Sequence, residues 1–484
     1  AHIRLGDAQW KNVDDPNSPG NLNNYINAYY QNPWWQIYHS REKSNTKSYT
    51  SSLTLSYKLF DWLTVTARSG YSKTMTNAPA HIDSVQYSKL AVSDPWKGGN
   101  IASSNKFVKF RNEIIDITHD DWNNDAYLTL KKKFKTITST LVAGGNYRQK
   151  NSNADWYYNE ADGRIAFSTR VDDPRGGGFA TLSYKTRDYS AYGDLTLGYN
   201  DWIFLHGSYR HEWTSILEPA QREFFYPGID ASAVLHDKLN FLKNSKYISF
   251  LKVRAGYAVT GTVNIPASTG VGGVAVLGLP TNGAYYINPT VSYGAGFPFD
   301  NLMGYVQSSR TVQSGLKPEK THSLEVGTEI GFLRDKIRLE AAYFKQVTYD
   351  QTLPVQTSTS SGVQSFLINS GKMQSSGVEF DLKLNPFIRS GKFAWNLTLN
   401  YSYLNNKVLE ILPSLGINDI TIGGPIYASV GLPYPIIKGS DFLRDDKGRI
   451  IVDITTGLPT VDPKAKIFGN TSYKDRLGIS SNMS

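Results

Sequence analysis

Long stretches of alternating apolar and polar side chains dominate the sequence. In residues 49–59, Tyr, Ser, Leu, Leu, Tyr and Leu occupy one face, and Thr, Ser, Thr, Ser and Lys occupy the other. The alternation resumes over residues 63–71, after a short turn at Phe60 and Asp61. A period of two is typical of a β-strand with one apolar and one polar face, so these segments predict a hairpin.

The same unit recurs along the chain, which predicts about a dozen strands in six hairpins. The further strands are expected at residues 126–132 and 135–147, 189–199 and 203–213, 231–235 and 248–259, 324–332 and 337–343, and 378–384 and 393–403. Long polar connections rich in Gly, Pro, Asn and Ser separate the hairpins, at residues 73–125, 149–188, 262–320, 346–376 and 405–470. Short and long connections therefore alternate, as they do in outer-membrane barrels with short periplasmic turns and long extracellular loops.

Strand length and aromatic placement favour the same architecture. Residues 49–59 span roughly 36 Å at about 3.3 Å per residue. Tilted by about 45°, they cross roughly 26 Å, close to the apolar band of about 25 Å in such barrels. Aromatic residues close both ends of the apolar faces at Tyr189 and Tyr199 and at Phe393 and Tyr403. The leucines between these ends are predicted to face lipid: Leu195, Leu197, Leu397 and Leu399.

The opposite faces of the expected strands carry charged side chains. These are Asp194, Arg210, Glu212, Glu325, Glu329, Glu340, Glu379, Asp381 and Lys383. In a soluble sheet they would face solvent, and in a barrel they would face a wet lumen or a plug. Alternation alone does not separate these cases, but the order of the loops and the strand length favour an all-β, antiparallel transmembrane β-barrel.

Composition narrows the function. The chain has 484 residues and no cysteine, which excludes a disulfide scaffold, a thiolate metal site and a cysteine nucleophile. Its net charge of +9 is spread thinly, without a run of like charges that would indicate nucleic-acid binding. No apolar run approaches the length of about 18 residues that a transmembrane helix requires. The 31 tyrosines suit a molecule with extended wet–dry boundaries.

Motifs of catalysis and metal binding are not found. The sequence has neither a phosphate-binding Gly-Lys-Ser/Thr loop nor a Gly-x-Ser-x-Gly elbow. His206 and His211 would lie on opposite faces of one strand, which suits no metal site. The acidic residues Asp441, Asp445, Asp446 and Asp453 do not follow the order of a calcium-binding loop, and a solvated hairpin is favoured. We therefore expect no cofactor, no metal ion and no enzymatic activity.

The order of several short segments resembles the SusC/RagA type of TonB-dependent outer-membrane transporters of Bacteroidetes. The segments are Gly-Leu-Lys-Pro-Glu at 315–319, Leu-Glu-Val-Gly at 324–327, Tyr-Phe at 343–344, Leu-Ile-Asn-Ser-Gly at 367–371 and Gly-Val-Glu-Phe at 377–380. Further segments at residues 32–35, 61–63, 209–215, 225–228, 251–257 and 446–450 fit as well. The resemblance covers residues 32–470.

This resemblance implies a barrel of 22 strands closed by a plug, which TonB energises from the inner membrane. It also implies a SusD-type surface lipoprotein as a lid, oligosaccharide or peptide cargo, and a place among the lipids and lipopolysaccharide of the outer membrane. No plug, TonB-contact segment or closing C-terminal strands are recognisable. Residues 1–484 are therefore expected to be a barrel portion whose sheet stays open between the strands near Tyr49 and Tyr403.

Aromatic side chains in the expected loops are the candidate ligand-binding residues, because sugars and peptides present apolar faces that stack on rings. They are Trp34, Trp35, Trp156, Tyr157, Tyr158, Tyr285, Tyr286 and Tyr293. Loop packing or contact with the lid is the ordinary explanation for such residues and is the alternative to ligand binding. A passive porin and a soluble all-β carbohydrate-binding or adhesion protein remain alternatives to an active importer.

Overall fold

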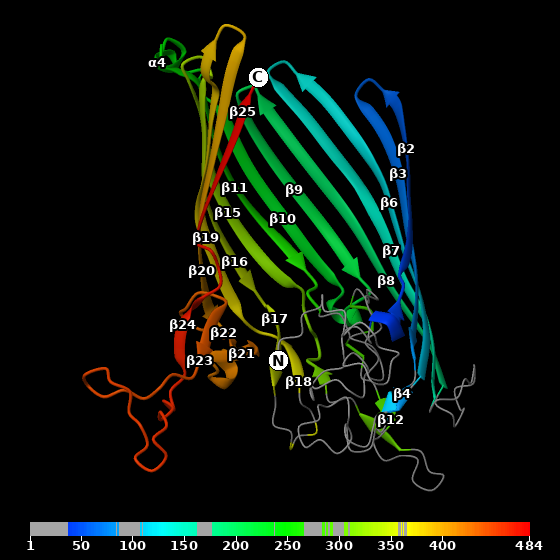
Figure 1. Ribbon diagram of the computed structural model, residues 1–484. Coiled ribbons are helices and arrows are strands. Elements are labelled where there is room, and N and C mark those ends of the chain that lie inside the picture. Colours follow the sequence, from blue (N-terminus) through cyan, green and yellow to red (C-terminus); the bar gives the residue numbers. More distant parts are fainter. Residues whose placement is uncertain are drawn as a thin grey trace.

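A computed structural model describes the part of the chain in which strands dominate. The described residues are 37–83, 85–86, 107–108, 110–161, 177–236, 238–265, 283–285, 287–288, 291–293, 304–307, 310–356, 360, 362 and 365–484. Most of them form a single antiparallel sheet that curves into a wall (Figure 1). The architecture is a partial β-barrel, as the alternation predicts. Among the described residues, no helix is long and apolar enough to cross a bilayer.

The large sheet has 14 strands, and their order in space follows their order in the chain. They are β1 (Ser40–Glu42), β2 (Asn45–Phe60), β3 (Leu63–Ile82), β6 (Phe110–Phe134), β7 (Ile137–Ala161), β8 (Gly177–Tyr199), β9 (Ile203–Thr214), β10 (Glu223–Val234), β11 (Ile248–Thr262), β15 (Glu319–Phe332), β16 (Ile337–Tyr349), β19 (Lys372–Ser390), β20 (Phe393–Glu410) and β25 (Asp475–Met483). Both β1 and β2 pair with β3.

Short and long connections lie at opposite ends of this wall (Figure 1). The upper end carries the tight turns and the short helix α4 (Asn240–Lys243). The lower end carries the small elements of the long connections: β4 (Val85–Gln86), β5 (Phe107–Val108), η2 (Pro219–Gln221), β12 (Val291–Tyr293), β13 (Tyr305–Gln307), β14 (Arg310–Val312), β17 (Thr352–Gln356), β18 (Ser365–Asn369), η5 (Pro413–Leu415), β21 (Asp419–Gly423), β22 (Ile426–Ser429), β23 (Ile436–Gly439) and β24 (Lys466–Asn470). We refer to these two ends as the turn end and the loop end.

All six predicted hairpins are present. In several of them, the tight turn that joins the two strands contains residues with positive φ angles. Between β8 and β9, Asn200 and Asp201 have φ angles of 50° and 59°. Asn and Asp tolerate this left-handed region better than most side chains, and turns of this kind match the twist of the flanking strands. The turn therefore fixes the register in which Leu197 faces Leu205.

At the loop end, four strands extend more than ten residues beyond their predicted bounds, and others extend by fewer. β3 continues to Ile82, β6 starts at Phe110, β7 continues to Ala161 and β8 starts at Gly177. The prediction that residues 73–125 and 149–188 are entirely loop is therefore wrong. Backbone pairing continues there while the side chains lose their alternation, because nothing at this height requires one whole side of the sheet to be apolar.

The register gives the sheet two distinct faces. Leu195, Leu197, Leu397 and Leu399 share one face, as predicted, and we call it the apolar face. Large side chains on it are exposed, for example Leu55 at 63% and Ile229 at 56%. The charged residues of the neighbouring positions share the other face, which we call the polar face.

The sheet is open in the described part of the chain. Its ends are the β1–β2 edge and β25, and no pairing joins β25 or β20 to β2. The strand β25 follows the last predicted hairpin and pairs with β20 from Tyr403 to Trp395. The expected open curved wall is therefore confirmed.

Candidate functional site

Ion pairs cross between neighbouring strands on the polar face. Arg254 of β11 reaches Glu325 of β15 at 3.1 Å and Glu340 of β16 at 2.7 Å. Arg338 of β16 lies 2.6 Å from Glu329 of β15. Because these side chains are only partly buried, each pair contributes little to stability. These ion pairs make the polar face of the wall charged and hydrated, which suits contact with a polar solute.

Similar ion pairs lie on the polar face of the strands from β3 to β9. Arg68 pairs with Asp125 at 2.9 Å and Arg148 with Asp121 at 2.5 Å. A cavity of about 290 Å³ lies over these strands. Its lining is polar or charged throughout: Arg68, Asn123, Asp125, Asn146, Arg148, Asp188, Arg210 and Glu212. Arg210 and Glu212 were predicted on this face and lie there.

His206 is held between two carboxylates on the polar face. Its Nε2 lies 2.6 Å from Asp194 Oδ2, and its Nδ1 lies 2.5 Å from Asp230 Oδ2. An imidazole donates from both nitrogens only when protonated. His211 lies on the other face and packs its ring 3.7 Å from that of Trp213, so the predicted separation of the two histidines is correct.

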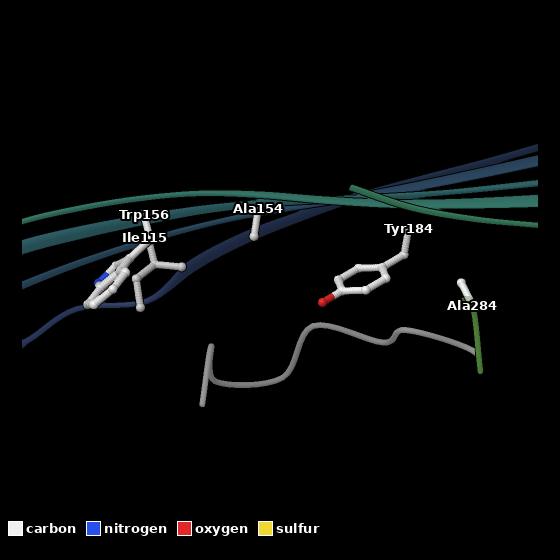
Figure 2. Packing of buried hydrophobic residues seen from close by; sticks show 5 residues of the cluster. All are labelled: Ile115, Ala154, Trp156, Tyr184 and Ala284. Carbon is white, nitrogen blue, oxygen red and sulfur yellow. The ribbon is translucent and has the colours of Figure 1, made fainter. Parts of the chain in front are cut away.

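A buried apolar cluster lies on the polar-face side near the loop end (Figure 2). Its members are Ile115, Ala154, Trp156, Tyr184 and Ala284. Figure 2 shows the strand side chains pointing toward the segment that carries Ala284, which belongs to the long connection after β11. Ala284 therefore places the described part of this connection around it against the polar face of the wall.

The candidate aromatic residues do not share one surface of the structure. Trp156 lies in β7 and is 8% exposed, so its prediction as a loop residue is wrong. Its indole N–H donates to the Glu113 carboxylate. Tyr157 points to the opposite side of β7 and is 40% exposed. Tyr285 follows Ala284, is 54% exposed, and has its ring centroid 6.5 Å from that of Tyr184.

Of the other candidate aromatic residues, some lie in described strands and the rest lie outside the described residues. Tyr158 also belongs to β7 rather than to a loop. Tyr293 ends β12, where its backbone pairs with Tyr305 of β13. Trp34, Trp35 and Tyr286 lie outside the described residues. Trp156 therefore belongs to the buried cluster, Tyr285 lies at its edge beside Tyr184, and Tyr157 lies on the opposite surface of the wall.

Two of the motif segments meet at the loop end, and we call residues 315–319 and 367–371 the latch. Asn369 accepts a hydrogen bond from the Lys317 amide and donates to the Lys317 carbonyl at 2.9 Å. Glu319 Oε1 accepts from the Thr352 amide at 2.9 Å. Gly315 has φ +72°, a left-handed conformation that favours glycine. Segments far apart in the chain are thereby tied together.

Apolar packing reinforces the latch. Leu316 and Leu367 are each 1% exposed and pack with Leu217 and Phe224, which flank η2. Glu218 Oε2 accepts a hydrogen bond from the Gly315 amide at 3.0 Å. The latch therefore joins three connections to the rim of the wall. The two motifs stand out in the sequence only by their resemblance to the family, and no pattern in the sequence predicts a contact between them.

A histidine–aspartate cluster fastens the far end of β3 to the segment before β1. His39 Nδ1 and His81 Nε2 each lie 2.8 Å from an Asp83 oxygen, and His81 Nδ1 lies 2.6 Å from Asn112 Oδ1. Hydrogen bonds to Asn112 and then to Asp83 raise the pKa of His81. Burial by itself would raise the pKa of Asp83, but the bonds to both imidazoles outweigh it and lower that pKa.

The aspartates of the 441–462 hairpin hold turns together. Asp445 accepts from the Lys447 and Arg449 amides, both at 2.9 Å, and Asp453 accepts from the Thr456 amide at 2.8 Å. Within the residues that the structure describes, no group of three acidic, histidine or cysteine side chains is arranged to hold a metal ion. These carboxylates stabilise the turns of the hairpin by accepting hydrogen bonds from its backbone amides.

The chain is similar to known outer-membrane receptors. The family model described as TonB dependent receptor-like, beta-barrel, matches residues 2–439. TonB-dependent receptor P26 of Formosa agariphila is 25% identical over 373 residues, covering 74% of this chain and 34% of the relative. TonB-dependent receptor SusC of Bacteroides thetaiotaomicron is 20% identical over 406 residues, covering 83% of this chain and 36% of the relative.

The fold is similar as well. The RagAB peptide importer in the closed-closed state matches with a TM-score of 0.73 at 15% identity, covering 94% of this chain and 48% of that chain. This chain spans about a third of the length of the curated relatives. The two faces of the wall now have an assignment, because in such barrels the apolar side contacts lipid and the polar side faces the lumen. The chain belongs to the TonB dependent receptor-like β-barrel family and is an outer-membrane β-barrel of the SusC/RagA type, a family of transporters and receptors rather than of enzymes.

Proposed function

We propose that this chain forms the barrel portion of an active importer of oligosaccharides or peptides. TonB energises the importer through a plug domain, and a SusD-type surface lipoprotein closes over its loop end. The observation that carries the proposal is the charged, hydrated lumen wall beneath an aromatic cluster at the loop end. The matched relatives, which include SusC, and the RagAB importer support the choice of an energised transporter.

The active importer and the passive porin differ in their need for energy. We expect uptake by the full-length transporter in its native cells to stop when TonB is deleted or the proton gradient is collapsed. Uptake that continues unchanged under both conditions would establish a porin. Feeding defined oligosaccharides and defined peptides separately would identify the cargo class.

Within this function we propose Tyr285 as a cargo contact, because its exposed ring lies beside the inner aromatic cluster. Tyr184, which is buried in that cluster, is the aromatic side chain that its ring lies beside. Tyr285→Ala is expected to weaken uptake at low cargo concentration while assembly stays normal, because the residue is outside the strand ladder. Tyr157→Ala is the matched control, since that ring points to the opposite side of β7. Equal uptake by the two variants would remove Tyr285 from the binding site.

A further inference from the structure

Three tyrosines lie in one row on the polar face of the wall. We call Tyr127 of β6, Tyr192 of β8 and Tyr226 of β10 the tyrosine row. The register puts Gly144 of β7 between Tyr127 and Tyr192. It puts Arg210 of β9 between Tyr192 and Tyr226. Aromatic rings on this face are unexpected, because the aromatic girdles of such barrels lie on the lipid side.

Gly144 leaves room for the first two rings of the row. A Cβ on Gly144 would lie 2.5 Å from Tyr127 Cβ, which is closer than two such carbon atoms approach. With neighbouring strands about 4.8 Å apart, Tyr127 and Tyr192 stand roughly 10 Å apart across this bare position. Both side chains are only half-buried, so part of each ring faces the lumen.

The cavity of about 290 Å³ over β3 to β9, which we call the charged cavity, adjoins the tyrosine row. Arg210 belongs to the row and to the lining of the cavity. Arg68, which also lines the cavity, interacts electrostatically with the phenol groups of Tyr127 and Tyr192. Aromatic surface and polar groups therefore meet in one place on the lumen wall.

The charged cavity is electrically balanced. Its lining has three guanidinium groups, three carboxylates and two side-chain amides. Arg68 pairs with Asp125 at 2.9 Å, and Arg210 Nε lies 3.2 Å from Glu212. With no excess of either sign, the lining offers little net attraction to an anion or a cation. A neutral ligand rich in hydroxyl groups suits it, because a hydroxyl donates to carboxylates and accepts from guanidinium and amide groups.

We propose that the tyrosine row and the charged cavity together bind a neutral pyranose ring of an oligosaccharide cargo inside the lumen. The apolar face of the sugar stacks on the ring of Tyr192, and its hydroxyl groups exchange hydrogen bonds with the cavity lining. This inference rests on the proposed importer function and selects the oligosaccharide from its two cargo classes.

The site is separate from the proposed contact at Tyr285. The ring of Tyr285 lies beside Tyr184, which is eight residues from Tyr192 on the same face of β8. Eight residues of strand correspond to roughly 26 Å. A cargo that has left the loop end therefore meets the tyrosine row as a second contact, deeper in the lumen.

The test uses the full-length transporter purified in detergent and an array of defined neutral oligosaccharides, acidic oligosaccharides and peptides. We expect neutral oligosaccharides to be retained and the other two classes not to be. Isothermal titration calorimetry then compares the affinity for a retained oligosaccharide between the unaltered protein and Tyr192→Leu. The affinity should fall roughly tenfold, because the aromatic surface is lost while the side chain stays apolar. Tyr192→Phe keeps the ring and should retain most of the affinity.

The matched control is Tyr189→Leu, which changes a ring of the same strand on the lipid-facing side, where it is exposed. Its affinity for the oligosaccharide should equal that of the unaltered protein. Tyr127→Leu, with the same expected loss, replaces Tyr192→Leu should that variant fail to fold.

An unchanged affinity of Tyr192→Leu overturns the proposal, as does an array that retains no neutral oligosaccharide. A variant with unchanged affinity but raised channel conductance would assign the tyrosine row to holding the plug instead. Uptake of the retained oligosaccharide by cells without TonB is a separate measurement. Uptake that continues there would refute the energised importer while leaving the sugar site in place.

Discussion

Replacing Leu316 by alanine tests whether the latch is held by packing. Leu316 is 1% exposed and contacts Leu217, Phe224 and Leu367, which come from two other parts of the chain. No strand of the large sheet includes it. The substitution should therefore loosen the loop end while the hairpins of the wall remain paired.

The size of the effect follows from the buried carbon atoms. Leucine to alanine removes three of them, at about 0.8 kcal/mol for each methylene, or about 2.4 kcal/mol. A residual cavity of up to about 80 Å³ adds up to about 2 kcal/mol at 24 cal/mol per Å³. A total of about 3–4 kcal/mol makes local opening of the latch roughly a hundred- to a thousand-fold more frequent, at 1.4 kcal/mol per tenfold.

Hydrogen exchange of the Gln313 amide reports this opening, because that amide donates to the Leu367 carbonyl at 2.8 Å. Leu415→Ala is the control, since this leucine of η5 is 71% exposed. We expect faster exchange at Gln313 in Leu316→Ala only, with unchanged exchange in β6 and β7. Equal exchange in the two variants would refute the assignment of Leu316 as the apolar anchor.

Three other results are expected. Leu397→Arg should cost roughly 2–4 kcal/mol of folding stability in vesicles, measured by urea titration, because the position faces lipid at mid-membrane; a cost near zero would contradict the register. Gly377→Ala should slow barrel assembly, read by electrophoretic mobility before and after heating, because a Cβ would collide with a backbone oxygen of β20, whereas Gly193→Ala meets no atom within 4 Å. Hydrogen bonds to an amide and a carboxylate raise the pKa of His81, so its stabilisation of the β1 segment is complete below about pH 6.5 and is lost as pH rises through the raised pKa; hydrogen-exchange protection factors of the β1 amides, corrected for the faster intrinsic exchange at high pH, that are equal at pH 6 and pH 9 would contradict this.

The sequence predicted the strands best where the membrane imposes alternation. The starts of β3, β9, β11, β16 and β20 next to the turns agree with the pattern, because one side of each strand must be apolar there. Beyond the membrane the pattern stops while the pairing continues, as residues 148–155 illustrate with seven polar side chains and one alanine. Trp156 was placed in a loop for this reason.

The candidate site could be predicted only in part. The charged residues of the lumen wall were found because they occupy every second position of a strand. The latch could not be found in this way, because Lys317 and Asn369 are 52 positions apart and neither residue belongs to an alternating pattern. The glycines at its ends, Gly315 and Gly371, are the local signal that was available, since both adopt positive φ angles. Their pairing in space comes from tertiary packing alone.

The strand order has a consequence for how such a wall is assembled. Since neighbours in the chain are neighbours in the sheet, each new hairpin can add to an existing edge without threading through a structure already formed. Closing a longer loop costs only about 0.6 kcal/mol for each doubling of its length. The connection 411–474 before β25 is roughly five doublings longer than a two-residue turn, which amounts to about 3 kcal/mol. Insertions in the extracellular connections are therefore inexpensive for folding, and such a scaffold can vary its outer loops while the order of assembly stays the same.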